Sequence, residues 1–249
     1  MFSQEPRCIY RRNYLLNVIC QLRFPEIPEI QNTFPKAFAE SVSDLFPEYS
    51  LHREPAVPPI SREPSSNHQL SSRDGMWHLN LTSKFLSLSC SRYSRWEDFA
   101  RYLDKPLVAL LSVYHPAIFD RVGLRYINAF DKTVSEHGEY RDLIAPCYLG
   151  ILAEADVAET APSRSSVDAE LAIGGGCRVK IHAGLGMVKN PLTQQQQPKF
   201  IFDQDLFLPG KVPVAYCAGA LEDIHSQAYG IFRGAITDQL HAAMDPQKV

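Results

Sequence analysis

The sequence predicts an α+β fold in which an antiparallel sheet carries long amphipathic helices on one face. Several segments alternate apolar and polar residues with a period of two, which is typical of half-buried strands. Two long segments repeat apolar residues at helical spacing, which predicts helices with one buried stripe. The order of strand, short helix, several strands and long helix in the first half recurs in the second half.

The alternating segments define the expected strands. Residues 14–24 place Val18, Cys20 and Leu22 on one face, and Asn17 on the other. Further strands are expected at residues 77–82, 86–91, 118–130, 147–153, 167–173, 177–183 and 200–208. The three glycines at 174–176 join two of these strands, which predicts a hairpin turn.

Two long helices are expected to cover the apolar face of the sheet. The first begins at Ser94-Arg95-Trp96-Glu97, a capping box in which the serine caps the helix and the glutamate bonds back to the cap. Pro106 lies inside its apolar stripe and is expected to kink it. The second is expected over residues 218–244. A shorter helix is expected to begin at Thr33 as its N-cap.

Two polar stretches are expected to be loops. Residues 54–75 hold four prolines and several serines, and residues 187–199 hold four consecutive glutamines. Whether these loops become ordered when a partner binds is left open.

The repeated order of elements predicts two α+β halves, residues 1–116 and 117–249, that together form one continuous domain. A repeated period in a sequence indicates a duplicated architecture, so a pseudo-two-fold duplication of a β-α-β-β-β-α unit is expected. Taken twice, this unit resembles the saddle of the TATA-box-binding protein. That resemblance concerns the fold and implies nothing about function.

Composition excludes several functional classes. The chain has 249 residues and a formal net charge of −3, so it lacks the overall positive charge typical of nucleic-acid-binding proteins. It has no apolar stretch approaching the roughly 18 residues of a membrane span, and residues 1–6 lack the features of a secretory signal. We therefore expect a cytoplasmic location without membrane contact. The six cysteines include no closely spaced pair and the eight histidines form no metal-binding pattern, so no metal or cofactor is expected.

The polar face of the predicted sheet is the candidate functional surface. It is expected to display Asn17, Gln21, Arg23, His78, Asn80, Arg121, Arg125, Arg178, Lys180 and His182. This set has a local positive bias, which favours an acidic or polar partner. The alternative is an ordinary solvated face, because polar residues at the surface usually face only water.

Eight residues are predicted to bind a ligand or partner: Arg23, Arg121, Arg125, Asn128, Arg178, Lys180, Asp203 and Asp205. Arg125 on a strand could hold a carboxylate or phosphate with two hydrogen bonds, or it could form an ion pair between strands. Asp203 and Asp205 project from the same face of their strand, because residues two apart in a strand point the same way. They could bind Mg²⁺ or act as an acid–base pair, or they could pair with an arginine across the sheet.

Several segments together resemble a family of proteins of roughly this length that is sporadically distributed in bacteria and archaea. The segments span nearly the whole chain. They are Leu22-Arg23-Phe24-Pro25, Leu45-Phe46-Pro47, Trp77-His78-Leu79-Asn80-Leu81-Thr82, Tyr93-Ser94-Arg95-Trp96-Glu97-Asp98-Phe99, Arg121-Val122-Gly123-Leu124-Arg125-Tyr126-Ile127-Asn128, Asp203-Gln204-Asp205 and Phe232-x-x-x-Ile236-Thr237. The part from Gly123 to Asn128 is the most specific. The family brings no activity, cofactor or catalytic residue with it. Its patchy occurrence is similar to that of mobile genes for defence, toxin–antitoxin or immunity functions, so the resemblance implies such a setting.

The resulting prediction is a non-catalytic binding module that uses its open polar sheet face to hold another protein in a defence or toxin–antitoxin complex. One alternative is a nucleic-acid or nucleotide binder that uses the arginines of this face. A further alternative is a metal-assisted hydrolase built on Asp203 and Asp205. Formation of a homodimer is left open.

Overall fold

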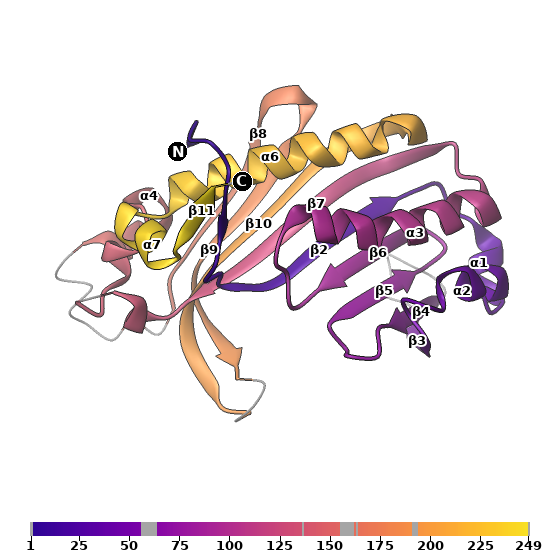
Figure 1. The fold of residues 1–249 in the computed structure, drawn as a ribbon, viewed down its shortest axis with the longest axis horizontal. Coiled ribbons are helices and arrows are strands. Elements are labelled where there is room, and N and C mark those ends of the chain that lie inside the picture. The colour runs from indigo at the N-terminus through magenta and orange to yellow at the C-terminus, as the bar shows by residue number, and fades with distance from the viewer. Residues whose placement is uncertain are drawn as a thin grey trace. The chain divides into compact units, whose positions relative to one another are not determined.

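The computed structural model describes residues 2–55, 64–135, 137–154, 162, 164–190 and 194–248. The chain forms a mixed α+β fold built on a nine-stranded antiparallel sheet, as predicted. The strand order is β3 (Glu48–Glu54), β4 (Ser65–Ser71), β5 (Trp77–Leu81), β6 (Phe85–Cys90), β2 (Leu15–Arg23), β7 (Ile118–Phe130), β10 (Gln196–Pro213), β9 (Arg178–Lys189) and β8 (Ser166–Ala172) (Figure 1). A second, two-stranded sheet pairs β1 (Cys8–Tyr10) with β11 (Pro246–Lys248).

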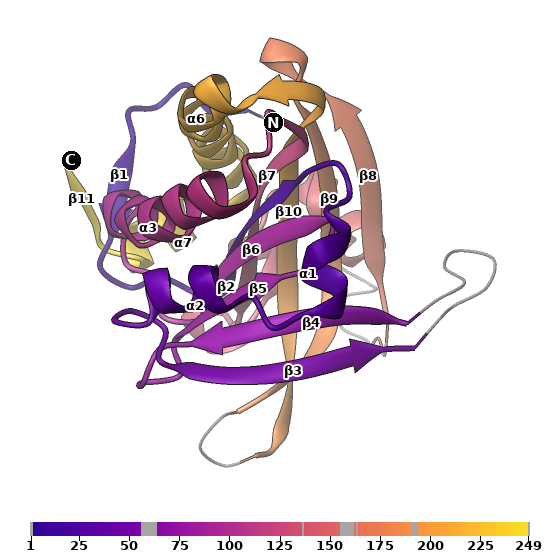
Figure 2. The same cartoon turned by 90° about the vertical axis from the view of Figure 1, so that its right-hand side faces the viewer.

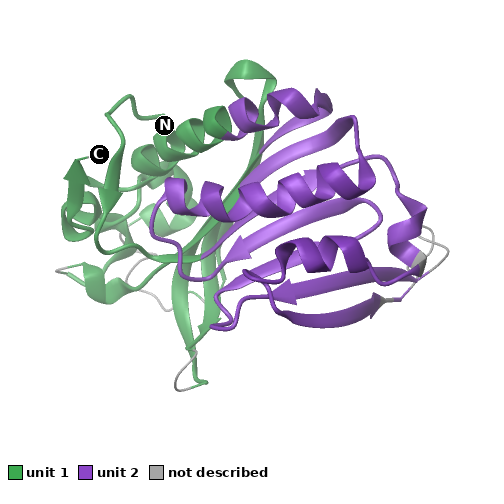
Figure 3. Cartoon of the chain, turned by 45° about the vertical axis from the view of Figure 1, so that its right-hand side comes forward, with its two compact units in different colours: residues 1–16, 125–206, 222–249 green, residues 17–124, 207–221 purple. Residues whose placement is uncertain are grey.

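The chain divides into two compact units that do not follow a single cut in the sequence. Unit 1 contains residues 1–16, 125–206 and 222–249, and unit 2 contains residues 17–124 and 207–221 (Figure 3). Strands β2, β7 and β10 and helix α6 (Cys217–Ala235) each begin in one unit and end in the other. This division differs from the predicted halves 1–116 and 117–249.

Unit 2 packs three helices on its part of the sheet. These are α1 (Pro28–Asn32), α2 (Lys36–Val42) and α3 (Trp96–Tyr114), and Figure 2 shows α2 and α3 on the same side of the strands. In β2, Val18, Cys20 and Leu22 are completely buried while Arg23 is exposed, as the two-residue alternation predicts. Strands β5 and β6 pair from Trp77–Cys90 to Leu81–Leu86, which confirms the predicted hairpin.

Unit 1 builds its sheet from the last part of β7, the first part of β10, and β9 and β8. The C-terminal part of α6 lies against β10, since Gln204 Nε2 donates to the Ala228 carbonyl at 3.2 Å. Smaller elements complete the unit: the helices α4 (Pro146–Leu149) and α7 (Asp238–Ala243), and 3₁₀ turns at Lys132–Val134, Tyr140–Asp142, Gly150–Ala153 and Gly174–Gly176. The predicted hairpin is confirmed, because β8 and β9 pair from Ser166–Gly184 to Ala172–Arg178 around the glycine turn.

Three predicted helix boundaries and one predicted strand need correction. Thr33 follows α1 as its C-cap and does not begin a helix, and α2 starts only after Pro35. Helix α3 has Arg95 as its N-cap, so Ser94 lies one residue too early to cap it and instead donates to Asp98 Oδ2 at 3.1 Å. The long helix expected over 218–244 is broken between α6 and α7. Residues 147–153 form helical turns and not a strand.

Both predicted loops contain strands. Ser65–Ser71, within 54–75, forms β4 and pairs with both β3 and β5. Strand β4 was not predicted because its residues are almost all polar, so the alternation of apolar and polar residues that indicates a strand is missing. The ends of β9 and β10 extend into 187–199, where the long hairpin continues beyond its apolar part. Residues 56–63 and 191–193 lie outside the described residues.

The order of elements is consistent with an internal duplication. The first half runs from β2 through short helices and strands to α3, and the second runs from β7 through α4 and strands to α6. Both long helices contain 19 residues. The duplication and the saddle-like shape stay predictions.

Candidate functional site: a charged groove on the sheet of unit 1

The polar face of unit 1 lies opposite helix α6. Along β10, Phe202, Gln204 and Leu206 are buried on the helix side, whereas Asp203 and Asp205 alternate with them on the other face. Strand β9 follows the same rule, with Val179 and Ile181 buried and the intervening residues exposed. Two-residue periodicity therefore aims the charged side chains of several strands at one surface.

A shallow groove of about 510 Å³ lies on this face. Its lining comes from four neighbouring strands and is mainly charged. The lining residues are Arg125, Asp168, Ala169, Glu170, Lys180, Ile181, His182, Asp203 and Asp205.

Arg125 and Asp203 form the best-defined contact in the groove. Arg125 Nε donates to both carboxylate oxygens of Asp203, at 2.8 and 3.1 Å, and Nη2 donates to Oδ2 at 2.5 Å. The Asp203 side chain is only 12% exposed, whereas that of Arg125 is 46% exposed. Hydrogen bonding to Asp203, together with the charges of Asp203 and Asp205, raises the pKa of Arg125. Of the two alternatives for Arg125, a bound ligand or an ion pair between strands, the structure contains the ion pair.

Cross-strand pairs hold the outer part of the groove. His182 Nδ1 donates to Asp168 Oδ1 at 2.7 Å, and the two residues are direct neighbours across β8 and β9. This hydrogen bond, with a second one from Ser166, lowers the pKa of Asp168, so the carboxylate stays charged. Glu170 lies 2.9 Å from Arg178 Nη2 and 3.9 Å from Lys180 Nζ.

The charge balance of the groove differs from the positive bias expected from the sequence. Its lining holds four carboxylates against two permanent cations, Arg125 and Lys180, so the groove is net negative, and one charge on His182 would not reverse this. The adjacent Arg178, which pairs with Glu170, reduces this surplus of carboxylates. The positive bias was expected because the residues counted for the open face did not include the acids Asp168, Glu170, Asp203 and Asp205. Asp203 and Asp205 were considered separately, as possible partners of an arginine across the sheet, and the structure places all four acids on the same face as the cations.

Three predicted binding residues do not belong to this groove. Arg23 Nε donates to Gln21 Oε1 at 2.9 Å within unit 2. Arg121 donates to the same oxygen at 3.2 Å, and its guanidinium lies 4.6 Å from the centre of the Phe207 ring. Asn128 is 2% exposed and donates to the Phe202 carbonyl at 3.4 Å, so it lies on the helix side of β7 and not on the open face. The other five predicted residues line the groove or lie beside it.

The two aspartates of β10 do not form part of a metal site in the described structure. Among the described residues, no group of three His, Cys, Asp or Glu side chains is arranged to hold a metal ion. Both oxygens of Asp203 already accept hydrogen bonds from Arg125. The residues therefore do not fit Mg²⁺ at this position.

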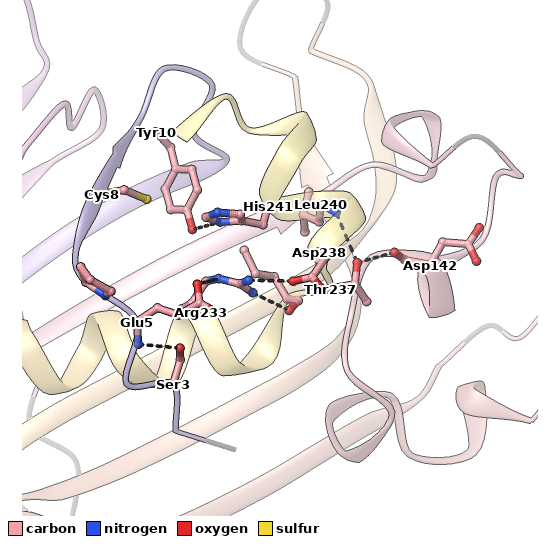
Figure 4. Close-up of polar contacts among 12 residues, drawn as sticks. Ser3, Glu5, Cys8, Tyr10, Asp142, Arg233, Thr237, Asp238, Leu240 and His241 are labelled. Carbon is pink, nitrogen blue, oxygen red and sulfur yellow. Dashed lines mark hydrogen bonds and ion pairs between the residues drawn. The ribbon is translucent and has the colours of Figure 1, made fainter. Parts of the chain in front are cut away.

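The sequence did not indicate a second polar cluster, which is built around the buried Arg233 of α6. Arg233 is 8% exposed; its Nε donates to Glu5 and its Nη2 to Asp238, each at 2.7 Å (Figure 4). Nearby, the Tyr10 hydroxyl lies 2.8 Å from His241 Nδ1. The one signal in the sequence was an arginine inside the apolar stripe of a predicted helix, which indicates a buried charge that needs a partner. The partner Glu5 lies 228 residues away in the chain, so sequence spacing could not identify it.

His225, a half-buried residue of α6, is bonded on both ring nitrogens. Arg7 donates to Nε2 at 2.6 Å, so the ring proton is on Nδ1, which contacts the Tyr126 hydroxyl at 2.8 Å. Arg7 and His225 line a cavity of about 670 Å³ between α6, the N-terminal residues and the β8–β9 turn.

Two findings complete the description. Within the described part of the chain, no helix is both long and apolar enough to cross a membrane. No family model, no curated protein and no solved structure matches this chain.

Proposed function

We propose that the protein is a non-catalytic binding module, and that its groove on β7–β10 receives a basic segment of a partner protein. The observation that carries this proposal is the surplus of carboxylates in an exposed groove formed by paired strands. Because the strands fix the positions of these side chains, a partner would meet charges that are already ordered. Preorganised polar groups reduce the entropy lost on binding.

The charge of the groove favours a protein partner over nucleic acid. Phosphate groups are bound by an excess of lysine and arginine, and that binding weakens steeply with salt. Here the arginines are already engaged, Arg125 by Asp203 and Arg178 by Glu170. A basic side chain could add to the carboxylates without displacing these pairs, whereas a phosphate would have to compete with them.

The hydrolase alternative has less support than the binding module. It requires both aspartates of β10 as metal ligands, and Asp203 is committed to Arg125. The setting in a defence or toxin–antitoxin complex rests on the family resemblance alone and is part of the proposal.

Binding to charged probes tests the proposal. A fluorescent lysine-rich peptide, a glutamate-rich peptide and a single-stranded oligonucleotide are titrated with the protein, with anisotropy as the readout. The lysine-rich peptide is expected to bind most tightly. Asp205→Asn is expected to weaken it several-fold, because it removes one carboxylate from the groove. Asp104→Asn on α3 makes the same charge change at an exposed site outside the groove and should have little effect.

Two outcomes would overturn the proposal. One is tight binding of the oligonucleotide with none of the lysine-rich peptide. The other is an equal response to Asp205→Asn and Asp104→Asn, because peptide binding would then reflect the net charge of the chain and not the groove.

A further inference from the structure

Strand β3 is an edge strand of the sheet in unit 2, and within the described residues no strand pairs with its outer side. In the sheet order it stands first, and β4 is the one described strand that pairs with it. The pairing runs without interruption from Glu48–Ser71 to Glu54–Ser65. In an extended strand, alternate backbone groups point to opposite edges, so about half of the N–H and C=O groups of β3 face away from β4.

This edge has few of the features that usually prevent pairing with another strand. Proteins protect exposed edges with charged side chains, above all lysine, and with proline, bulges or short strands. Strand β3 has seven residues, no proline, no lysine and no bulge against β4, and its charged residues Glu48, Arg53 and Glu54 lie toward its two ends. Its described side chains, residues 48–53, are all exposed.

An apolar cluster lies along the same edge. Tyr49 and Leu51, two residues apart, project from one face of β3 and are 40% and 43% exposed. Phe34, 52% exposed, packs edge-on against Tyr49 with ring centres 4.8 Å apart. We call Phe34, Tyr49 and Leu51 the edge cluster.

Tyr49 is held in place by the interior of the unit. His68 Nε2 contacts the Ile30 carbonyl at 2.8 Å, and because that carbonyl can only accept, His68 Nδ1 accepts from the Tyr49 hydroxyl at 3.0 Å. His68 itself is 2% exposed. The exposed tyrosine is therefore anchored through its hydroxyl to the buried His68, and a side chain that is ordered before binding loses less entropy on binding.

We propose that β3 pairs antiparallel with β3 of a second copy of this chain, with the two-fold axis at Ser50. In this register Tyr49 lies opposite Leu51 of the second copy, and Glu48 lies opposite His52 of the second copy. Each contact occurs twice, so the two edge clusters form one apolar patch on one face of the joined sheets, and the two carboxylate–imidazole pairs lie on the opposite face. Moving the axis to Leu51 would instead place Glu48 opposite Glu54 of the second copy, and like charges directly opposite one another are unfavourable.

The other edge strand, β8, supports the choice of β3 by contrast. Strand β8 is equally long and also unbulged against β9. However, pairing it with itself around Ala169 would place Asp168 opposite Glu170 of the second copy. Its alternating residues are exposed acids and half-buried apolar side chains, without an exposed aromatic residue. Paired around its central residue, β8 would bring like charges together, whereas β3 paired around its own near-central Ser50 would not.

Sedimentation velocity over a range of concentrations tests the proposal on the full chain. A single pair of strands buries a small area, so a reversible dimer in the micromolar range is expected. Leu51→Lys places a charge in the apolar patch and should shift the dimer to monomer at concentrations where the unchanged chain is dimeric. Val108→Lys makes the same change at a 61% exposed residue of α3 and should leave the dimer intact. Circular dichroism establishes that both variants are folded.

Disulfide cross-linking tests the register. The exposed Cys147 is first replaced by serine, and Ser50→Cys is then introduced into that background. Oxidation should give a covalent dimer, because position 50 of one copy faces position 50 of the second copy at the axis. The Cβ atoms of two residues that face each other across strands lie about 5 Å apart. Ala169→Cys on β8 in the same background should not cross-link. A chain that stays monomeric at all concentrations, a dimer that resists Leu51→Lys, or open-ended oligomers from unlike edges would each overturn the proposal.

Discussion

At the residue scale, the Arg125–Asp203 pair defines the candidate site. A nearly buried carboxylate is paired with a guanidinium that donates to both of its oxygens. Bidentate contacts of this kind require the planar fork of arginine, which lysine cannot replace. The pair thus fixes the geometry of the groove at the junction of β7 and β10.

Replacement of Arg125 by lysine tests the importance of this geometry. Arg125→Lys is expected to lower the free energy of unfolding by about 1–2 kcal/mol, a value reduced by solvent screening at the half-exposed arginine. Arg178→Lys is the matched control, because Arg178 and Glu170 are both well exposed and such pairs contribute little. Urea denaturation of both variants measures the difference. Equal effects would show that Asp203 does not depend on the bidentate contact.

Because of His241, the folded protein is expected to lose stability in weak acid. Burial, reinforced by the charge of Arg233, lowers the pKa of His241 from its ordinary value of 6.5. The unfolded chain therefore takes up a proton at higher pH than the folded chain. Stability should fall as the pH drops from above 6.5 through the lower pKa of the folded state, and then level off. NMR titration of the ring protons measures the pKa, and His241→Gln should remove this part of the pH dependence. A measured pKa at or above 6.5 would contradict the prediction.

The sequence was sufficient to place Asp203 and Asp205 on one face, because strand alternation is a local property. It also suggested an arginine partner for them but could not identify which one. That choice depends on the register of β7 against β10, which joins residues 78 positions apart. The Glu5–Arg233 contact could not be predicted for the same reason.

At the element scale, the segment Gly123-Leu124-Arg125-Tyr126-Ile127-Asn128 shows how one strand serves two faces. Leu124 and Tyr126 face the core, and Tyr126 reaches His225, whereas Arg125 faces the groove. A side chain at Gly123 would displace the guanidinium of Arg121, since an added Cβ would lie 2.6 Å from Arg121 Nη1. The alternation was predictable from the sequence, but the close approach at Gly123 depends on how Arg121 folds back over the strand.

The break between α6 and α7 depends on Thr237. Its hydroxyl accepts from the Leu240 N–H at 3.3 Å as the N-cap of α7 and donates to the Asp142 carbonyl at 2.5 Å (Figure 4). The continuous apolar spacing over 218–244 hid this break, because the spacing resumes after one turn. A threonine followed by an aspartate was the available signal for a new N-terminus.

Replacement of Thr237 by valine keeps its shape and removes both hydrogen bonds. Thr237→Val is expected to cost about 1–2 kcal/mol in the free energy of unfolding, while Thr237→Ser should recover most of it. Thr33→Val is the control, because the Thr33 hydroxyl donates to Glu29 at an exposed position. Urea denaturation compares the three variants. A loss no larger than that of Thr33→Val would argue that the cap does not stabilise α7.

At the scale of the whole molecule, the two units are interleaved along the chain. The predicted halves would each be a continuous stretch of sequence, but unit 2 also needs residues 117–124 and 207–221. Those segments supply buried side chains to it, among them Phe119, Val122 and Cys217, which are at most 1% exposed. Hydrophobic periodicity identifies such residues as core, but it does not say which core they join.

A fragment of residues 1–116 is therefore expected not to fold by itself. It lacks the buried residues that β7, β10 and α6 contribute to unit 2, and the net stability of a domain is only about 5–15 kcal/mol. Removing several fully buried side chains, at about 1.5–3 kcal/mol each, is enough to exceed that margin. Far-ultraviolet circular dichroism and NMR dispersion should show an unfolded chain. Residues 17–124 joined by a flexible linker to 207–221 are the matched comparison and should recover ordered structure. A cooperative unfolding transition in the 1–116 fragment would contradict this prediction and favour the contiguous halves, because the buried residues of β7, β10 and α6 would then be dispensable.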